Sequence, residues 1–305
     1  KVDQYIGKLL GMASDDTIVM IVSDHGHGGN SIKAIYLNKW LEGCDLLRFK
    51  TNINKRLLSS VLNLAKEVGL KSLSPTLRKK ILRKTKLAHK TESWLRFSHI
   101  DFGHTRAYSE ETPYFPTIWI NVKGREPAGI VEPGKEYEAI REHIICELAN
   151  WLDPDTGQPV VGKVYRREEA YSGPLLERSA DLVIEWNLNN GYSYLFKSSQ
   201  DGRGCMPISR IDEKERERSK SGSHLGSGIF IASGKDLKRQ TELDGAEIID
   251  LAPTILYLLG LPIPSDMDGK ILTQIFKDDY LTSHPVQYCN GPEVDGSLTY
   301  YGGHK

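Results

Sequence analysis

The sequence predicts an α/β fold with a mainly parallel central sheet flanked by helices, together with a helical, basic insertion that forms a cap. Three observations support this prediction. Apolar runs without polar alternation recur along the chain, which is typical of strands buried on both faces of a parallel sheet. Segments with helical spacing separate these runs, as in folds where strands and helices alternate. Residues 48–96 are rich in Lys and Arg, and have leucines at helical spacing instead of β-branched runs.

The first predicted element is an amphipathic helix over residues 2–10, in which apolar residues such as Val2, Ile6 and Leu9 recur at helical spacing. No capping residue precedes this helix, so we expect the chain to be the C-terminal part of a longer protein. A buried strand follows over residues 17–22 and runs into a loop at 23–30. In open α/β sheets ligands bind beyond the carboxyl ends of the strands, so we expect a site at this loop.

The later elements continue the alternation. We predict strands at residues 117–122, 160–165, 181–186 and 228–233, and helices at 137–152 and 251–259. The chain divides into four parts: a core segment with the first buried strand (1–45), a helical basic insertion or cap (46–105), the rest of the α/β core (106–282) and an irregular tail (283–305). The basic insertion is either a solvated helix face, a surface that attracts anionic substrate or a membrane-surface element.

Composition excludes several classes of protein. Lys+Arg and Asp+Glu each number 40, and this zero net charge argues against a dedicated nucleic-acid-binding protein. No apolar run approaches the ~18 residues of a membrane-spanning helix. The four cysteines show no C-x-x-C spacing and no signal peptide is visible, so we expect a reducing compartment and a cytoplasmic location. The sequence does not indicate the oligomeric state.

Two histidine motifs are candidates for metal binding. Asp24 and His25 follow the first buried strand, and a carboxylate and an imidazole on one turn can both bind a divalent cation such as Zn²⁺. Glycines next to this pair, Gly28 among them, would let the backbone turn and leave room for a ligand. His224 lies in a glycine-rich segment just before the strand at 228–233. Asp-His pairs are also common in loops with no metal, and that alternative remains open on the motifs alone.

The order of these motifs resembles the alkaline phosphatase superfamily. A buried strand enters Ser-Asp-His-Gly at 23–26, Gly-Ser-His follows at 222–224, and the helix at 251–259 precedes Met-Asp-Gly at 267–269. The pattern is most similar to the type I phosphodiesterase/nucleotide pyrophosphatase-like branch. The segments at 105–108, 124–131 and 167–174 look like the predicted phosphohydrolase/phosphomutase group of that superfamily. The resemblance covers most of residues 1–280.

This resemblance implies a metal-dependent hydrolase of phosphate mono- or diesters that uses two divalent metal ions, usually zinc and sometimes manganese. Asp24 and His25 would bind one metal, and His224 would bind the other. Two cations can clamp the attacking and leaving oxygens of an in-line displacement. The implied substrate is a small phosphorylated or nucleotide-like molecule. His27, Arg106 and Arg125 are further candidates for substrate binding, since a guanidinium fork suits a phosphoryl oxygen. Pairing of the arginines with Glu126 or Glu169, and a loop histidine without a role, are the structural alternatives.

The sequence departs from the superfamily in one respect. The Thr or Ser nucleophile and the remaining Asp and His ligands lie upstream of the Asp-His strand in that superfamily, and residues 1–23 offer no suitable arrangement. We therefore expect the nucleophile upstream of Lys1, and poor metal binding and little activity from this chain alone. Two alternatives remain open: a phosphomutase, and a catalytically inactive fragment or pseudoenzyme that binds an anion or a protein partner.

Overall fold

A computed structural model describes residues 1–50, 97–112, 115–199, 206–218, 221–239 and 242–290 of the chain. The chain forms two compact units. Unit 1 consists of Lys1–Gly26 and Gly226–Lys305, and unit 2 consists of His27–Leu225. The chain therefore passes from one unit to the other twice, once in the segment that carries His25 and once in the segment that carries His224.

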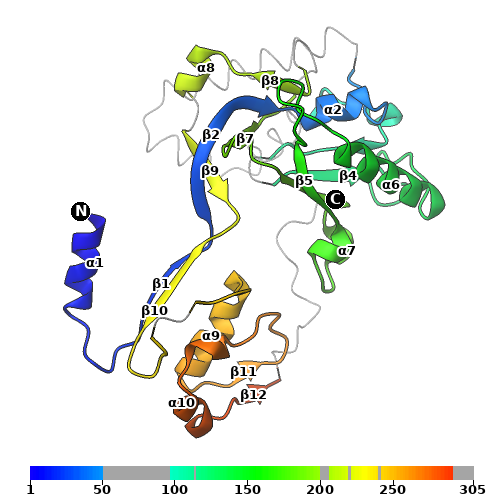
Figure 1. Cartoon of the computed structure of the whole chain (residues 1–305). Coiled ribbons are helices and arrows are strands. Elements are labelled where there is room, and N and C mark those ends of the chain that lie inside the picture. The colour runs from blue at the N-terminus through cyan, green and yellow to red at the C-terminus, as the bar shows by residue number, and fades with distance from the viewer. Residues whose placement is uncertain (51–96, 113–114, 200–205, 219–220, 240–241, 291–305) are drawn as a thin grey trace, which may run out of the picture. The chain divides into compact units, whose positions relative to one another are not determined.

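Unit 1 contains a two-stranded antiparallel ribbon and a small helical core (Figure 1). Strand β1 (Val19–Ser23) pairs with β10 (Ile229–Ser233), with Val19 opposite Ser233 and Ser23 opposite Ile229. Helix α1 (Val2–Leu10) precedes the ribbon and buries none of its residues. The other elements are η3 (Ile248–Asp250), α9 (Leu251–Leu258), β11 (Ile263–Pro264), η4 (Thr273–Ile275), α10 (Asp278–Ser283) and β12 (Tyr288–Cys289). Strands β11 and β12 are parallel.

The core of unit 1 forms where α9 and the segments after it pack together. Its buried side chains are Leu237, Tyr257, Ile263, Leu272, Ile275 and Phe276. Tyr257 and Phe276 meet edge to face, with their ring centroids 5.2 Å apart. Phe230 and Ala232 of β10 pack against this cluster, so one face of the ribbon is covered by it.

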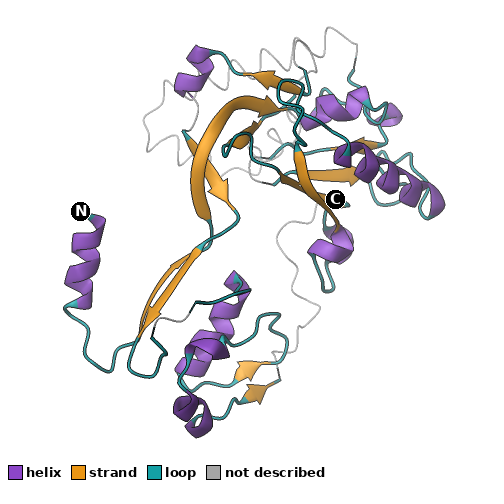
Figure 2. Cartoon of the chain, in the orientation of Figure 1, coloured by secondary structure: helices purple, strands orange, loops and turns teal. Residues whose placement is uncertain are grey.

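Unit 2 contains two four-stranded sheets (Figure 2). The first has the order β7-β2-β8, with β9 also paired to β2. The second has the order β3-β4-β6-β5. The strands are β2 (Gly26–Ile35), β3 (Ala107–Tyr108), β4 (Thr117–Ile120), β5 (Val161–Arg166), β6 (Leu182–Trp186), β7 (Ser193–Phe196), β8 (Ile208–Arg210) and β9 (Gly222–Leu225). The helices are α2 (Leu37–Gly43), η1 (Phe102–His104), α6 (Lys135–Ala149), α7 (Arg167–Ala170), η2 (Leu176–Arg178) and α8 (Glu213–Arg218).

Helix α6 supplies much of the core of unit 2, because its apolar residues recur at helical spacing. Ile140, Ile144 and Leu148 are buried on one side of this helix. They belong to the same cluster as the fully buried Ile118 and Ile120 of β4. The strands predicted at 117–122, 160–165, 181–186 and 228–233 and the helices at 137–152 and 251–259 are all present, with small shifts at their ends.

The prediction of a mainly parallel central sheet is wrong. Every pairing of the β3-β4-β6-β5 sheet is antiparallel, as are β1 with β10 and β2 with β8. Of the described residues, the strand pairs β2 with β7 and β11 with β12 are parallel. The physical reason is that an apolar run indicates a strand near a core but carries no information about strand direction. Strand β4 alternates between buried and half-buried residues, and Ile21 and Val22 of β1 are exposed, so these runs do not have both faces buried.

Most of the predicted basic helical insertion (46–105) falls in residues 51–96, which lie outside the described residues. Within the described part of the chain, no helix is both long and apolar enough to cross a membrane.

Candidate functional site

Asp24 and His25 directly follow β1, at the end of the ribbon in unit 1. The Ser23 hydroxyl donates to the His25 carbonyl oxygen at 2.7 Å, which holds the turn. His25 Nδ1 lies 2.8 Å from the carbonyl oxygen of Gly26. A carbonyl oxygen only accepts, so Nδ1 carries the proton and the lone pair is on Nε2. Nε2 lies 3.7 Å from Asp24 Oδ1, so the nitrogen and oxygen donors that a divalent cation needs are close together.

This donor pair suits zinc or manganese chemically, but it is incomplete as a metal centre. The described residues contain no group of three or more His, Cys, Asp and Glu side chains arranged to hold a metal ion. Asp24 and His25 belong to unit 1, whereas His224 belongs to unit 2. The two-metal site therefore remains a hypothesis.

A cavity of about 1070 Å³ lies in unit 1 and reaches Asp24. Its lining is about equally polar and apolar: it includes the apolar residues Val22, Phe230 and Leu251 and the charged residues Lys238 and Glu247. This volume is at the upper end of the range typical of small-molecule sites. Asp24 thus contributes to the lining of a space large enough for a small phosphorylated molecule.

His27 and His224 lie on neighbouring strands of unit 2, because β9 pairs with β2. Both side chains are exposed. The sequence predicted a loop at 23–30 in which glycines leave room for a ligand, but the chain enters β2 at Gly26. The space beside Gly28 and Gly29 is taken by side chains of the chain itself and is not open to a ligand. A Cβ on Gly28 would lie 2.9 Å from Cδ1 of Leu225, and one on Gly29 would lie 2.7 Å from Cδ1 of Tyr192. These two glycines make room for side chains of the protein itself.

The two candidate arginines have different surroundings. The Arg125 guanidinium donates two bonds to the Asp181 carboxylate at 2.7 and 2.6 Å, one to the Ile120 carbonyl oxygen at 2.6 Å and one to Glu126 at 3.0 Å. Its fork is therefore occupied within the chain. Arg106 makes one long bond to Glu136 at 3.5 Å, and its side chain is 44% exposed. Of the two, Arg106 has more capacity for an external anion.

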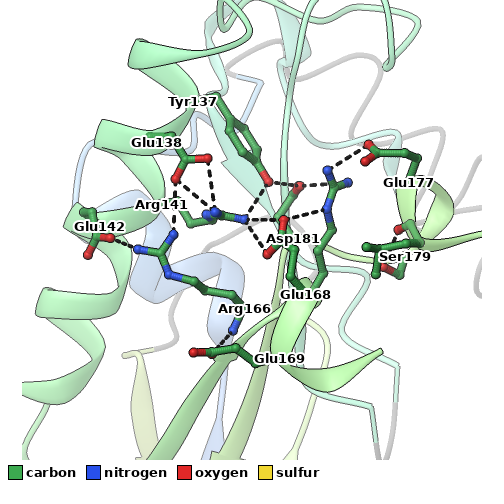
Figure 3. A network of polar contacts seen from close by, with 12 residues as sticks. Tyr137, Glu138, Arg141, Glu142, Arg166, Glu168, Glu169, Glu177, Ser179 and Asp181 are labelled. Atoms are coloured by element: carbon green, nitrogen blue, oxygen red, sulfur yellow. Dashed lines mark hydrogen bonds and ion pairs between the residues drawn. The ribbon is translucent and has the colours of Figure 1, made fainter. Parts of the chain in front are cut away.

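Sequence reasoning missed the central role of Asp181. This carboxylate is fully buried directly before β6 and accepts the Tyr137 hydroxyl at 2.8 Å (Figure 3). Besides its bonds from Arg125, it also accepts the Ile120 N–H at 2.7 Å. Burial and the Asp181 charge raise the pKa of Tyr137 to about 12, so the hydroxyl keeps its proton and donates. An acidic residue directly before an apolar strand was the available signal, but its partners are far away in sequence.

Arg166 and the start of the segment at 167–174 belong to the same polar network. Arg141 donates to both carboxylate oxygens of Glu168 at 2.9 Å and to those of Glu138 at 3.1 and 2.9 Å (Figure 3). Arg166 pairs with Glu138 and Glu142. Arg167 donates to Glu177 at 2.8 Å. Each of these arginines has carboxylate partners within the chain, so the network joins α6, β5 and α7 and serves the fold.

Comparison with known proteins gives one match. The family model described as Type I phosphodiesterase / nucleotide pyrophosphatase matches residues 1–224. No curated protein and no solved structure matches the chain.

Proposed function

The chain belongs to the type I phosphodiesterase/nucleotide pyrophosphatase family, and on this premise we propose that it is part of a metal-dependent hydrolase of phosphate mono- or diesters. The family suggests phosphoester hydrolysis and small phosphorylated substrates, and it is generally metal-dependent. The observation that carries the proposal is the extent of the match. Residues 1–224 include the Asp24-His25 pair and reach His224.

We propose Asp24 and His25 as ligands of one divalent cation and His224 as a ligand of a second, with zinc or manganese as the metal. The 3.7 Å separation of His25 Nε2 from Asp24 Oδ1 supports the first part. Bound cations would neutralise charge on the phosphoryl group during transfer. The chain's own contribution is to fix the donors. The Gly26 carbonyl sets the tautomer of His25, and the Ser23 hydroxyl holds the turn.

For the phosphoryl oxygens we propose Arg106 ahead of Arg125, because the Arg125 guanidinium is already bonded to Asp181. His27 is also a candidate contact, since its side chain is exposed on the strand that follows the metal pair.

We further propose that the nucleophilic Thr or Ser and the remaining metal ligands come from residues outside this sequence. Acidic residues that precede Asp24 are poorly placed to be the remaining metal ligands. Asp16 pairs with Lys235, and Asp3 lies on the exposed helix α1. The hydroxyls of Ser14 and Thr17 bond to one another at 3.0 Å in a turn.

A phosphomutase would use the same metals, and a binding module without activity is the second candidate.

The test combines metal content with hydrolysis of nitrophenyl phosphate and bis-nitrophenyl phosphate. We expect the 305-residue chain alone to bind zinc weakly and to turn over slowly. In a longer form that includes preceding residues, we expect activity that Asp24→Asn lowers by at least about 100-fold, because the variant loses a charged ligand. Asp15→Asn is the matched control and should be neutral.

Equal activity of Asp24→Asn and the parent protein would overturn the metal assignment. Strong zinc-dependent turnover by the chain alone would overturn the need for further residues. Transfer of the phosphoryl group back to the substrate, without release of phosphate, would identify a mutase.

A further inference from the structure

Strands β2 and β9 of unit 2 interlock through two pairs that each consist of a glycine and a large side chain. The His27 imidazole lies directly against Gly222, so that a Cβ on Gly222 would overlap its Cε1 atom and lie 2.9 Å from Nε2. Gly28 meets Leu225 in the reverse sense, because a Cβ there would lie 2.9 and 3.1 Å from Leu225 Cδ1 and Cγ. Each strand therefore places one large side chain over a glycine of the other.

These pairs allow one register of the two strands. The strands run in opposite directions side by side (Figure 1), and the Asn30 N–H donates to the Ser221 carbonyl oxygen at 3.0 Å. Side chains alternate between the two faces of a strand, so His224 is on the same face as Gly222. A slip of one residue would turn His224 to the other face. The same slip would bring the ring of His27 against the side chain of Ser223, where the glycine now leaves space.

We propose that His27 is a positioning residue: its ring, seated on Gly222, sets the register of β9 on β2 and thereby holds His224 on its face of the sheet. Leu225 over Gly28 is the second half of this register lock. The role does not require a nitrogen ligand at His27, only a ring that fills the space over Gly222. The importance of His224 rests on the proposed function, but the lock itself does not.

The lock is tested first in the metal-free 305-residue chain. His27→Ala should speed hydrogen exchange of the β9 amides and lower the melting temperature, whereas His27→Phe, which keeps a ring, should retain most of both. Gly222→Ala should be destabilising. In a chain that already carries His27→Ala, the Gly222→Ala substitution should destabilise less, because the added Cβ at position 222 no longer meets the ring of His27. The relief is partial, since the same Cβ would still lie 2.8 Å from the Gly28 carbonyl oxygen.

If the effects of His27→Ala and Gly222→Ala on the melting temperature are strictly additive in the double variant, the lock is overturned, because residues that share no contact do not couple. So would a His27→Phe variant that behaves like His27→Ala.

Zinc titration followed by the imidazole ¹⁵N signal of His224 then separates positioning from ligation. We expect His27→Phe to bind zinc like the parent chain, His27→Ala to bind about 10-fold more weakly and His224→Ala to lose the site. If His27→Phe loses zinc as fully as His224→Ala, His27 is a ligand and the positioning role is overturned. If none of the three substitutions changes zinc binding while the coupling with Gly222 persists, the metal assignment fails and the lock is supported.

Discussion

At the scale of single residues, Lys33 is buried and its charge is matched by two carboxylates. Its Nζ lies 2.5 Å from Asp153 Oδ1 and 3.0 Å from Asp155 Oδ2, and the side chains of Lys33 and Asp153 are 5% and 0% exposed. Asp153 also accepts the Tyr194 hydroxyl at 2.9 Å. Both charges are thus removed from water and satisfied by each other, and the pair ties β2 to the turn after α6.

We predict that Lys33→Met destabilises unit 2 by about 3–5 kcal/mol, because it leaves the Asp153 carboxylate buried without its cation. The matched control is Lys123→Met, which removes an ion pair with Glu132 in which both side chains are at least half exposed. The control should lose no more than about 1 kcal/mol. Urea unfolding of the two variants measures the difference, and equal losses would contradict the prediction.

The same pair predicts a pH dependence. Burial alone would raise the pKa of Asp153 and lower that of Lys33. The bonds of Lys33 to Asp153 and Asp155 outweigh burial and raise the pKa of Lys33, and the bonds that Asp153 accepts from Lys33, the Asp155 N–H and the Tyr194 hydroxyl outweigh burial and lower the pKa of Asp153. The stabilisation by Asp153 is complete above its unfolded pKa of about 3.9, and is lost as the pH falls through the lowered value. The stabilisation by Lys33 is complete below its unfolded pKa of about 10.4, and is lost as the pH rises through its raised pKa in the folded chain.

We therefore expect the difference in unfolding free energy between the parent chain and Asp153→Asn to be constant across the neutral range and to shrink in acid. Urea unfolding at a series of pH values measures it. A difference that grows in acid would reverse the sign and refute the assignment.

What the sequence reveals about single residues depends on how far away their partners are. The Asp24-His25 contact could be predicted, because both residues lie on one turn. The partner of Arg125 could not, because Asp181 lies 56 positions further along and only the folded sheet brings them together. The role of Gly28 was misread for the same reason, since the side chain that needs its space comes from a distant strand.

At the scale of elements, apolar patterning located the strands β1, β4, β5, β6 and β10 and the helices α1, α6 and α9, but not the pairing of the strands. The other strands of the described residues are short or polar, and apolar patterning did not locate them. The positions of β4, β5 and β6 follow from runs of apolar and β-branched residues. Their antiparallel order depends on how the connections fold back, which local composition does not encode. Strand β8 and helix α8 were not predicted, because their short polar sequences carry little periodic signal.

Strand β10 gives a prediction at this scale, because its residues alternate between two environments. Phe230 packs against the core of unit 1, whereas Ile231 is 55% exposed. We expect Phe230→Ala to destabilise unit 1 by about 2 kcal/mol through lost apolar burial. Ile231→Thr should change its stability by no more than about 0.5 kcal/mol. Thermal unfolding of both variants measures this, and a larger loss for Ile231→Thr would show that the exposed face of the ribbon is covered in solution.

At the scale of the whole molecule, the described residues form two separate hydrophobic cores, one for each unit. The buried cluster of unit 2 draws on β4, β6, α2 and α6, and is much larger than that of unit 1. The chain passes between the units in two glycine-rich segments, at 26–29 and 222–228. Their glycines were interpreted as room for a ligand, and the division into units was not predicted from them. Separate cores are the physical basis for separate unfolding.

We predict two thermal transitions in calorimetry, with unit 1 unfolding first because its smaller core buries less apolar surface. Phe276→Ala, in the core of unit 1, should lower only the first transition, and Ile120→Ala, in the core of unit 2, should lower only the second. Each substitution empties a fully buried position, so a shift of several degrees is expected in the transition that it affects. A single transition that both variants move together would show that the two cores unfold as one cooperative body, and that the passages at Gly26 and Leu225 do not separate them.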